Sequence, residues 1–539
     1  MTDLAARPSP LVTAIVLFAL AGTMASLRLR TYDEPVEFDI ALYAVVGHEM
    51  HEGRKLYSEI WDQKPPAIHT TYMLAESLLG YGPRAVYGLN VLASTWTLFA
   101  VFAAGSAFPP GRSSGLWAAT LWALISDNLI LQANQPNSEV FMNALTATAF
   151  ALWVRAPRGP GFVCTLVIGA LVCLASMYKQ VILAPAVLWA VADVAFPPAE
   201  SSRVRRLLTA ISVFAVVAVG WVALGYHFYA DGRWDDFYGT VVLYNKAYAG
   251  SPLKNLLFAI RPYRFLGDLP SAAPLMGMLA VAGASIALVW RAAPARPWRL
   301  LAAYGVGAWA AAQAPGKGFP HYFQLLLPPL VIAAGATIGL LREMFATYSP
   351  QLRPWLASAA RVVPLFAGLA VVGQQVYFDY HNYRRPAHEW ARRKYGTFYH
   401  RVEELGHTIG TLLEPDETLF VFADLRPGLY YYSQRRPAAG VLFTDPLIRG
   451  PLVERMTDRT LDQLRATPPE LVVIALNDPL DERAEYADRP TPLDPKTNRV
   501  SEWLLERYKC RPELDVAGME VYTLRNGRLA ERLAAKEGR

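Results

Sequence analysis

The apolar residues of this chain gather in long blocks, and polar residues separate each block from the next. Most blocks are close to the roughly 20 residues that an α-helix needs to cross the hydrocarbon core of a membrane. The blocks extend over residues 10–28, 84–108, 114–132, 138–154, 161–178, 180–197, 207–229, 271–290, 299–315, 321–341 and 359–379. The pattern therefore predicts an α-helical polytopic membrane protein with about eleven transmembrane helices.

The first block has a second interpretation. Arg7 precedes it, and the small residues Ala21, Gly22 and Ala25 lie near its end, which is also the pattern of a cleaved signal peptide. We favour a retained helix, because the number of spans then agrees with the distribution of arginines among the connections.

Arginines are concentrated in every second connection between the blocks, and short cytoplasmic loops carry such an excess of positive charge. The residues concerned include Arg112, Arg155, Arg203, Arg296 and Arg342. With an odd number of spans, this bias predicts a cytoplasmic N-terminus and an extracytoplasmic C-terminus.

The pattern changes near residue 380, where charged residues become frequent. Short apolar runs at 417–424, 470–478 and 518–524 predict buried strands, and 391–414, 458–466 and 500–508 predict helices between them. We therefore expect a membrane domain over residues 1–380, with its first outer loop at 29–83, and a soluble extracytoplasmic α/β domain over residues 381–539.

Composition agrees with this division. The chain is 53% hydrophobic and 18% charged, and its formal net charge of +6 comes mainly from arginines of the predicted cytoplasmic loops. Such charge suits an anionic lipid surface, so we expect membrane lipids as partners and no nucleic acid. Cys164, Cys173 and Cys510 have neither disulfide-framework nor zinc-site spacing.

The first outer loop contains unusual chemistry for a connection between membrane helices. Asp39, Tyr43, Ala44, Gly47 and Met50 recur at helical spacing, which predicts a short amphipathic helix lying on the membrane surface. Asp39 would stand at the start of this helix, so a simple N-cap role is an alternative to a chemical one.

Lys64 follows in the same loop and precedes two prolines, Pro65 and Pro66. The prolines fix the backbone and prevent a helix from continuing through this point. A lysine held in a rigid turn near the lipid headgroups is well placed to bind a phosphate. The alternative is a lysine that merely extends toward the membrane surface.

The order Asp39, Tyr43-Ala44, Glu49-Met50 and Lys64-Pro65 resembles the first outer loop of the GT-C-fold membrane glycosyltransferases. It is most similar to their bacterial branch, which is related to protein O-mannosyltransferases and lipid A aminoarabinose transferases. Ile40 stands where that family usually has Glu. The sequence Tyr-Asp-Glu with Asp33 and Glu34 offers a competing alignment, but Asp39 fits the spacing without a gap.

Three later segments resemble the same family in order along the chain. They are NQPNSEVFMN at 134–143, which contains Glu139; MYKQVIL at 177–183, which contains Lys179; and FPHYFQLLLPPL at 319–330, which contains His321 and Tyr322. All fall at the predicted outer side, so together the four segments are more specific than any one of them.

The resemblance implies an inverting transfer of a sugar, hexose or pentose, from a polyprenyl-phosphate donor to an extracytoplasmic acceptor. Such a reaction needs a base for the acceptor's proton and positive charge for the leaving phosphate. Asp39 would be the base and Glu139 would orient the acceptor. Lys64, Lys179 and His321 would bind the donor phosphate.

Tyr43, Trp61 and Tyr322 would contact the sugar, although an aromatic belt at the membrane interface explains such residues equally well. We expect no tightly bound cofactor. A divalent ion shared by Asp39 and Glu139 is left open, because two carboxylates are a small ligand set for such an ion.

Two other functions are alternatives. A lipid or glycan transporter would place ionisable groups near the middle of the bilayer, which the predicted spans largely lack. An inactive membrane scaffold with a binding α/β module is the other, and Ile40 keeps it open. The resemblance implies residence in a bacterial inner membrane.

Overall fold

The computed structural model describes residues 8–129, 131–258, 271–290, 295–348, 351, 353–475, 498–516 and 518–537. Arg7, residues 259–270 between two of the predicted spans, and residues 476–478 of a predicted strand lie outside this part. The chain forms two compact units. Unit 1 contains residues 1–32, 87–226 and 249–386, and unit 2 contains 33–86, 227–248 and 387–539.

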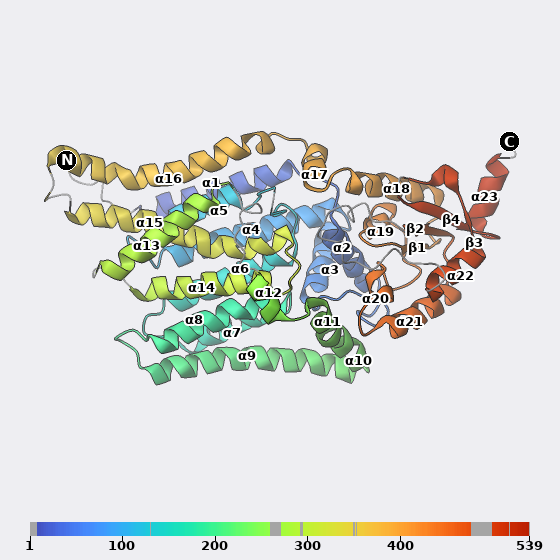
Figure 1. Ribbon diagram of the computed structural model, residues 1–539, viewed down its shortest axis with the longest axis horizontal. Helices are drawn as coiled ribbons and strands as arrows, with labels where there is room; N and C mark the ends of the chain where they lie inside the picture. Colours follow the sequence, from blue (N-terminus) through green and yellow to red (C-terminus); the bar gives the residue numbers. More distant parts are fainter. Residues whose placement is uncertain are drawn as a thin grey trace. The chain divides into compact units, whose positions relative to one another are not determined.

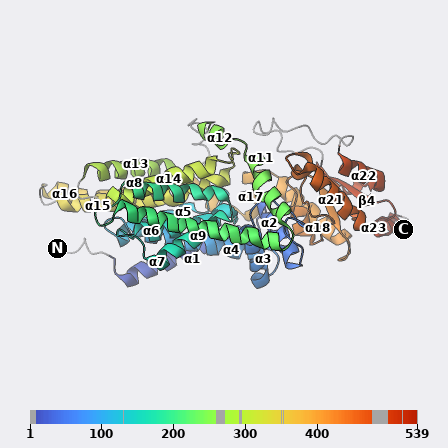
Figure 2. The same ribbon diagram turned by 90° about the horizontal axis from the view of Figure 1, so that it is seen from below.

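Unit 1 is built from helices that run side by side, as both ribbon views show (Figures 1 and 2). Each predicted span coincides with a helix, although the ends differ by several residues in places. The helices are α1 (Pro10–Leu29), α4 (Pro83–Gly105), α5 (Arg112–Ile125), α6 (Ser138–Val154), α7 (Phe162–Ser176), η1 (Gln180–Ile182) with α8 (Leu183–Ala195), α9 (Arg203–Ala230), α12 (Pro252–Phe258), α13 (Ala273–Val289), α14 (Ala295–Gln313), η4 (Pro320–Leu326) with α15 (Leu327–Tyr348), and α16 (Pro354–Tyr383).

Five helical segments of the described chain are long and apolar enough to cross a membrane: 10–29, 83–105, 203–230, 320–348 and 362–383. Four shorter apolar helical segments accompany them, at 138–154, 162–176, 180–195 and 273–289. Helices α5 and α14 belong to neither the long nor the shorter group of apolar segments. The number of about eleven transmembrane helices therefore stays a prediction.

Small residues allow the helices of unit 1 to approach closely. A Cβ atom on Gly335 of α15 would lie 2.5 Å from the backbone nitrogen of Ala118 in α5, and one on Gly307 of α14 would lie 2.3 Å from Cα of Pro185 in α8. Helices in lipid associate through such close packing, because burial of apolar surface gives them little additional driving force.

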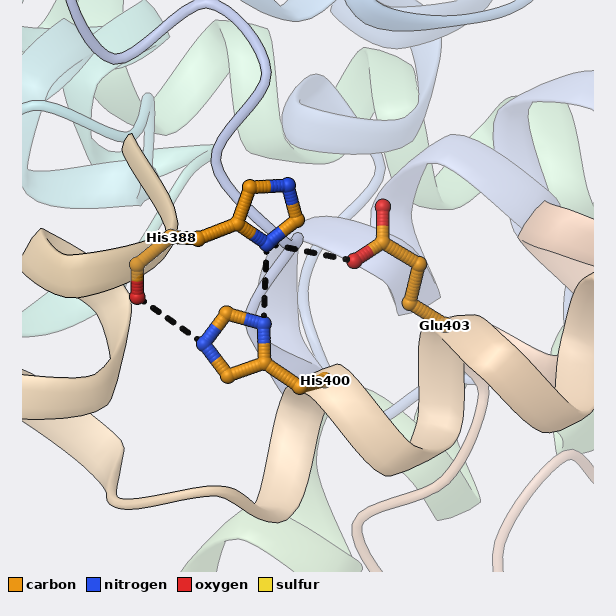
Figure 3. A group of neighbouring side chains, drawn as sticks. All are labelled: His388, His400 and Glu403. Atoms are coloured by element: carbon orange, nitrogen blue, oxygen red, sulfur yellow. Dashed lines mark hydrogen bonds and ion pairs between the residues drawn. The ribbon is translucent and has the colours of Figure 1, made fainter. Parts of the chain in front are cut away.

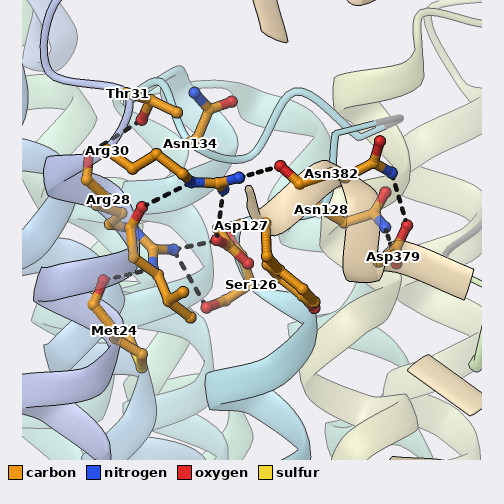
Figure 4. Close-up of polar contacts among 12 residues, drawn as sticks. Met24, Arg28, Arg30, Thr31, Ser126, Asp127, Asn128, Asn134, Asp379 and Asn382 are labelled. Atoms are coloured by element: carbon orange, nitrogen blue, oxygen red, sulfur yellow. Dashed lines mark hydrogen bonds and ion pairs between the residues drawn. The ribbon is translucent and has the colours of Figure 1, made fainter. Parts of the chain in front are cut away.

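Buried polar groups also connect the helices of unit 1 (Figure 4). Arg28 of α1 donates from Nη2 to the carbonyl of Ser126, just after α5, at 2.7 Å. Arg30 lies 3.5 Å from the carboxylate of Asp127. Asn128 donates to Asp379 of α16 at 3.3 Å. These contacts join α1, α5 and α16 where a charge without a counter-charge would be costly.

Unit 2 combines three separate stretches of sequence. Its helices are α2 (Phe38–His51), α3 (Ala67–Leu79), α10 (Trp234–Tyr238), the π-helix η2 (Gly239–Tyr244), α17 (Ala387–Tyr395), α18 (Phe398–Leu412), α19 (Gly428–Ser433), α20 (Asp445–Ile448), α21 (Val453–Ala466), α22 (Arg499–Arg507), η7 (Pro512–Leu514) and α23 (Arg528–Glu537). Helix α11 (Asn245–Ala249) lies at its boundary with unit 1.

A four-stranded sheet lies within unit 2, with the order β1-β2-β4-β3. Its strands are β1 (Leu419–Phe422), β2 (Leu471–Ile474), β3 (Tyr508–Cys510) and β4 (Glu520–Leu524). β1 and β2 are parallel, and the remaining pairs are antiparallel. Three strands fall at predicted positions. The sequence did not predict β3, whose three residues follow α22 directly and are too short to show alternation.

The predicted helix at 391–414 is in fact two helices, α17 and α18. Gly396 separates them with a φ of +68°, a conformation that glycine adopts readily. The turn brings α17 against α18.

The first outer loop and the C-terminal segment are joined within unit 2. Glu34 forms a buried ion pair with Lys394. The Tyr432 hydroxyl accepts the Val36 N–H at 2.8 Å, and the Trp61 N–H donates to the carbonyl of Gly440 at 2.9 Å. The compact units therefore divide the chain differently from the sequential boundary predicted near residue 380.

Candidate active site

Helix α2 begins with two acidic side chains. Glu37, and not Asp39, is the N-cap residue, and its Oε2 accepts the Asp39 N–H at 3.0 Å. Asp39 lies in the first turn and is 8% exposed. The alternative that Asp39 serves as the N-cap is therefore wrong, and its carboxylate lies near the positive end of the helix dipole.

Glu37 is protonated more readily than an ordinary glutamate. Burial and the neighbouring charge of Asp39 raise the pKa of Glu37 from 4.5 to about 8, although Lys394 acts in the opposite direction. The start of α2 therefore carries a carboxyl group that retains its proton at neutral pH.

The expectation of an amphipathic α2 with one exposed face is wrong. Ten of its residues are buried, from Asp39 through Gly47 and Glu49. A Cβ atom on Gly47 would lie 2.9 Å from the backbone nitrogen of Met73 in α3, so the two helices touch closely. Because α2 is enclosed by protein, it holds Asp39 in a fixed position.

Lys64 lies in a turn that several contacts fix. Pro66 is the residue that precedes α3, and the Tyr57 hydroxyl donates to the Lys64 carbonyl at 2.8 Å. The Asn245 side chain donates to the carbonyl of Gln63 at 2.7 Å. Lys64 is 7% exposed, and its Nζ lies 3.9 Å from Oδ1 of Asp39. The structure therefore brings the predicted base and the predicted phosphate ligand together.

Tyr43 and Trp61 lie in the interior of unit 2. Tyr43 has no exposed surface, and its ring lies 5.8 Å from that of His69 and 5.9 Å from that of Tyr72. Trp61 is 1% exposed and donates from Nε1 to the hydroxyl of Thr240 at 2.9 Å. Tyr43 packs against α3, and Trp61 anchors the segment that precedes Lys64. The contact of either residue with a sugar stays a prediction.

The competing acidic pair has a different environment. Asp33 is exposed, whereas Glu34 is buried and paired with Lys394. Glu34 therefore neutralises a buried lysine of the C-terminal segment, which gives it a structural role.

A polar cavity of about 220 Å³ also lies in unit 2. Glu49, of the predicted Glu-Met motif, is among its lining residues and is paired with Arg54 at 3.2 Å and Arg436 at 3.7 Å. Burial raises the pKa of Glu49, while both arginines act to lower it. At this cavity, the ion pair between Glu49 and Arg436 connects the first outer loop to the C-terminal segment.

Unit 1 contains a second cluster of predicted site residues. Glu139 lies in the first turn of α6 and is fully buried. Lys179, just before η1, donates from Nζ to Oε1 of Glu139 at 2.7 Å and lies 3.8 Å from the centre of the Tyr322 ring. Three segments that are far apart in sequence therefore place a carboxylate, an ammonium group and an aromatic face together.

His321 flanks this cluster in η4. Its ring lies 4.7 Å from the Tyr322 ring, and its Nδ1 lies 3.4 Å from Oε1 of Gln132. His321 is 5% exposed, so it is an interior residue of unit 1.

Asp39 belongs to unit 2 and Glu139 to unit 1. The divalent ion that the sequence left open for these two carboxylates therefore stays a prediction.

Sequence reasoning missed two residues that position the predicted pair. Glu37 could have been recognised as an acidic residue directly before an apolar helical pattern. Tyr57 has a φ of +71°, which is unusual for a residue with a side chain, and nothing in its local sequence indicates it.

No known protein-family profile and no curated protein sequence matches this chain. Several solved structures, in contrast, are similar to this chain in fold. The structure of ArnT from Cupriavidus metallidurans bound to undecaprenyl phosphate superposes with a TM-score of 0.58 and 16% identity, over 97% of this chain and 99% of that one. Its apo form gives a TM-score of 0.59 and 14% identity, over 94% and 97%.

The oligosaccharyltransferase of Archaeoglobus fulgidus, tethered to an acceptor peptide, gives a TM-score of 0.51 and 14% identity, over 86% of this chain and 69% of that one. Likeness at these identities concerns the fold. This likeness and the apolar helices together indicate an integral membrane protein with the GT-C fold.

Proposed function

We propose that this protein is an inverting glycosyltransferase that moves a sugar from a polyprenyl-phosphate donor to an acceptor outside the cytoplasm. The observation that carries the proposal is the pair of Asp39 and Lys64, which are 3.9 Å apart in a part of the chain enclosed by protein. The fold likeness to ArnT bound to undecaprenyl phosphate supports a lipid-linked donor.

Lys64 binds the donor phosphate in this proposal. As the bond to the sugar breaks, negative charge grows on the leaving phosphate, and a fixed ammonium group stabilises that charge most where water is scarce. The rigid turn before Pro65, together with the hydrogen bond from Tyr57, reduces the reorganisation that the lysine needs.

Asp39 accepts the proton of the acceptor's nucleophile. A carboxylate must be within hydrogen-bond reach of that group, on the side of the sugar opposite the phosphate, for the transfer to invert the anomeric centre. Burial of α2 holds Asp39 in place, and its neighbour Glu37 provides a proton-bearing group at the same helix start.

Glu139 and Lys179 have roles of their own in unit 1. We assign acceptor orientation to Glu139 and phosphate binding to Lys179 and His321. The 2.7 Å ion pair and the Tyr322 ring under the ammonium group support these assignments, because both restrict the lysine to one position.

Residence in a bacterial inner membrane, with a cytoplasmic N-terminus and an extracytoplasmic C-terminal segment, belongs to the same proposal. The arginine bias of alternate connections supports it. The donor is then a lipid-linked sugar presented at the outer surface.

The test follows donor turnover. Purified protein in lipid nanodiscs is incubated with an envelope fraction and polyprenyl phosphates that carry a hexose, a pentose or an amino sugar, and released polyprenyl phosphate is measured by mass spectrometry. Asp39→Asn should lower turnover by roughly 100-fold or more, the range for loss of a general base. Asp33→Asn is the matched control and should retain turnover.

Unfolding curves of both variants separate loss of chemistry from loss of fold. Wild-type turnover by Asp39→Asn would overturn the assignment of the base. Absence of turnover by the wild type with every donor, while undecaprenyl phosphate still binds, would instead favour a scaffold that recognises the lipid without catalysis.

A further inference from the structure

Two histidines and a glutamate meet where α17 packs against α18 (Figure 3). Nδ1 of His388 lies 3.0 Å from Nδ1 of His400 and 3.9 Å from Oε2 of Glu403. One ligand atom from each residue lies within 4.8 Å of the other two. The proposed transfer reaction uses none of these residues.

The local fold explains why the three side chains converge. His400 and Glu403 are three residues apart on α18, so they occupy the same face of that helix. The turn at Gly396 folds α17 back, which places the His388 ring 5.0 Å from the His400 ring. His388 is exposed and the other two are half-buried, so an ion from solvent has access.

Hydrogen bonding fixes the tautomer of His400. Its Nε2 lies 2.9 Å from the backbone carbonyl of His388, and only a protonated Nε2 can donate to that oxygen. In a neutral ring, the lone pair is then on Nδ1, which faces His388. Histidines that bind metal ions are commonly oriented in this way, with the other N–H of the same ring donating to a carbonyl oxygen.

The spacing of the ligand atoms is close to that of a zinc site. Tetrahedral zinc with Zn–N bonds of about 2.0–2.1 Å separates its ligand atoms by about 3.3 Å. The two ring nitrogens are 3.0 Å apart, and Oε2 of Glu403, which is 3.9 Å from Nδ1 of His388, needs to approach that nitrogen by about 0.6 Å. Side-chain rotation alone provides such a movement.

The charge around the cluster is mixed. Asp33 adds negative charge near Glu403, whereas Arg392 and His407 add positive charge to the surroundings. The carboxylates of Asp33 and Glu403 therefore offset part of the repulsion between a bound cation and the nearby basic residues.

We propose that His388, His400 and Glu403 bind one divalent ion of the zinc class, with water in the fourth position. The ion replaces the proton shared between the two Nδ1 atoms. It links α17 to α18 and so holds together the first two helices that follow α16 in the chain. This role is structural and is independent of the proposed transfer reaction.

The test uses the full-length protein without a polyhistidine tag, purified in detergent and treated with a chelator. Calorimetric titration with Zn²⁺ should show one ion per chain, and Zn²⁺ should raise the temperature of unfolding. Titration with Co²⁺ should give the visible absorption of a four-coordinate site. His400→Ala should weaken Zn²⁺ binding at least tenfold.

His407→Ala is the matched control, because His407 lies on the same helix without being a proposed ligand, and the loss of its positive charge should not weaken Zn²⁺ binding. Glu403→Gln is a milder variant that keeps the test valid where His400→Ala fails to fold, and it should also weaken binding. Absence of stoichiometric Zn²⁺ in the wild type would overturn the proposal. Equal binding by the wild type and the folded site variants would overturn it as well.

Discussion

Nζ of Lys64 lies 3.9 Å from Oδ1 of Asp39, and the two side chains are only 9% and 12% exposed. Opposite charges in such surroundings interact more strongly than they would in water. Lys64 is placed by a turn and Asp39 by a helix start, so different local features fix the two members of the pair. This independence makes the two proposed roles separable by mutation.

Lys64→Ala should weaken the binding of undecaprenyl phosphate about 10- to 100-fold, since a hydrogen bond to a charged group contributes about 1.5–3 kcal/mol. Binding is measured by titration of nanodisc-embedded protein with the lipid phosphate. The aspartate that Lys64 leaves behind adds repulsion toward the phosphate.

Lys55→Ala is the control for this measurement, because Lys55 is an exposed lysine of the same loop. It should bind the lipid phosphate as the wild type does. An equal loss in both variants would mean that binding depends on the general charge of the loop and not on the Lys64 turn.

The pattern of apolar blocks predicted where the helices of unit 1 lie, because a membrane span imprints its length and composition directly on the sequence. One loop motif and a family resemblance assigned Asp39 and Lys64 to one reaction, but neither predicted that the two side chains lie 3.9 Å apart. The enclosed position of α2 was not predictable, since α3 and residues of the C-terminal segment cover it, and such distant contacts leave no periodicity in α2 itself.

Breaking the ion pair between Glu139 and Lys179 should destabilise unit 1. Lys179→Met removes the 2.7 Å partner of the fully buried Glu139, and breaking a buried ion pair by removing one member costs roughly 3–5 kcal/mol. The double variant Lys179→Met with Glu139→Gln should recover much of that loss, because it removes both charges. Thermal unfolding in lipid nanodiscs measures the difference.

Recovery in the double variant is the decisive observation. Additive losses from Lys179→Met and Glu139→Gln would show that the two side chains contribute separately to stability. Turnover of the double variant should stay low, since the proposed roles of both residues are absent.

Stability should fall as pH rises from about 4.5 to about 8, in a way that depends on Glu37. Because its pKa is raised to about 8, the folded chain holds a proton that the unfolded chain releases near its ordinary pKa of 4.5. This contribution is complete below pH 4.5 and is lost as pH approaches 8. Glu37→Gln should remove this part of the pH dependence and still cap α2.

The comparison is made by denaturant unfolding at pH 5 and pH 8. Glu52→Gln, an exposed acidic position at the end of α2, should retain the wild-type pH dependence. A Glu37→Gln variant with the same pH slope as the wild type would show that another group is responsible.

The contacts that place Lys64 illustrate a second limit of sequence reasoning. Pro65 and Pro66 predicted a rigid turn, because proline restricts the backbone locally. The partners that complete it, Tyr57 and Asn245, are indicated by no local pattern. Tyr57 adopts a positive φ, and Asn245 comes from a distant segment whose contact with Gln63 appears only in the folded chain.

Gly440→Ala should destabilise unit 2 by about 1–3 kcal/mol and also weaken lipid-phosphate binding. A Cβ atom at this position would lie 2.0 Å from the backbone oxygen of Glu59, so one backbone segment must move. The movement affects Trp61, whose N–H donates to the Gly440 carbonyl, and through it the turn at Lys64. Thermal unfolding and the lipid-phosphate titration measure the two effects together.

Gly305→Ala is the control, because a Cβ atom on Gly305 of α14 has no neighbour within 4 Å. Alanine also favours a helix more than glycine does, so this variant should be as stable as the wild type or slightly more stable. If Gly440→Ala unfolded at the wild-type temperature, the C-terminal segment would not hold the outer loop through this contact. If Gly440→Ala lost stability but bound the lipid phosphate normally, the Lys64 turn would keep its geometry without the support of Trp61.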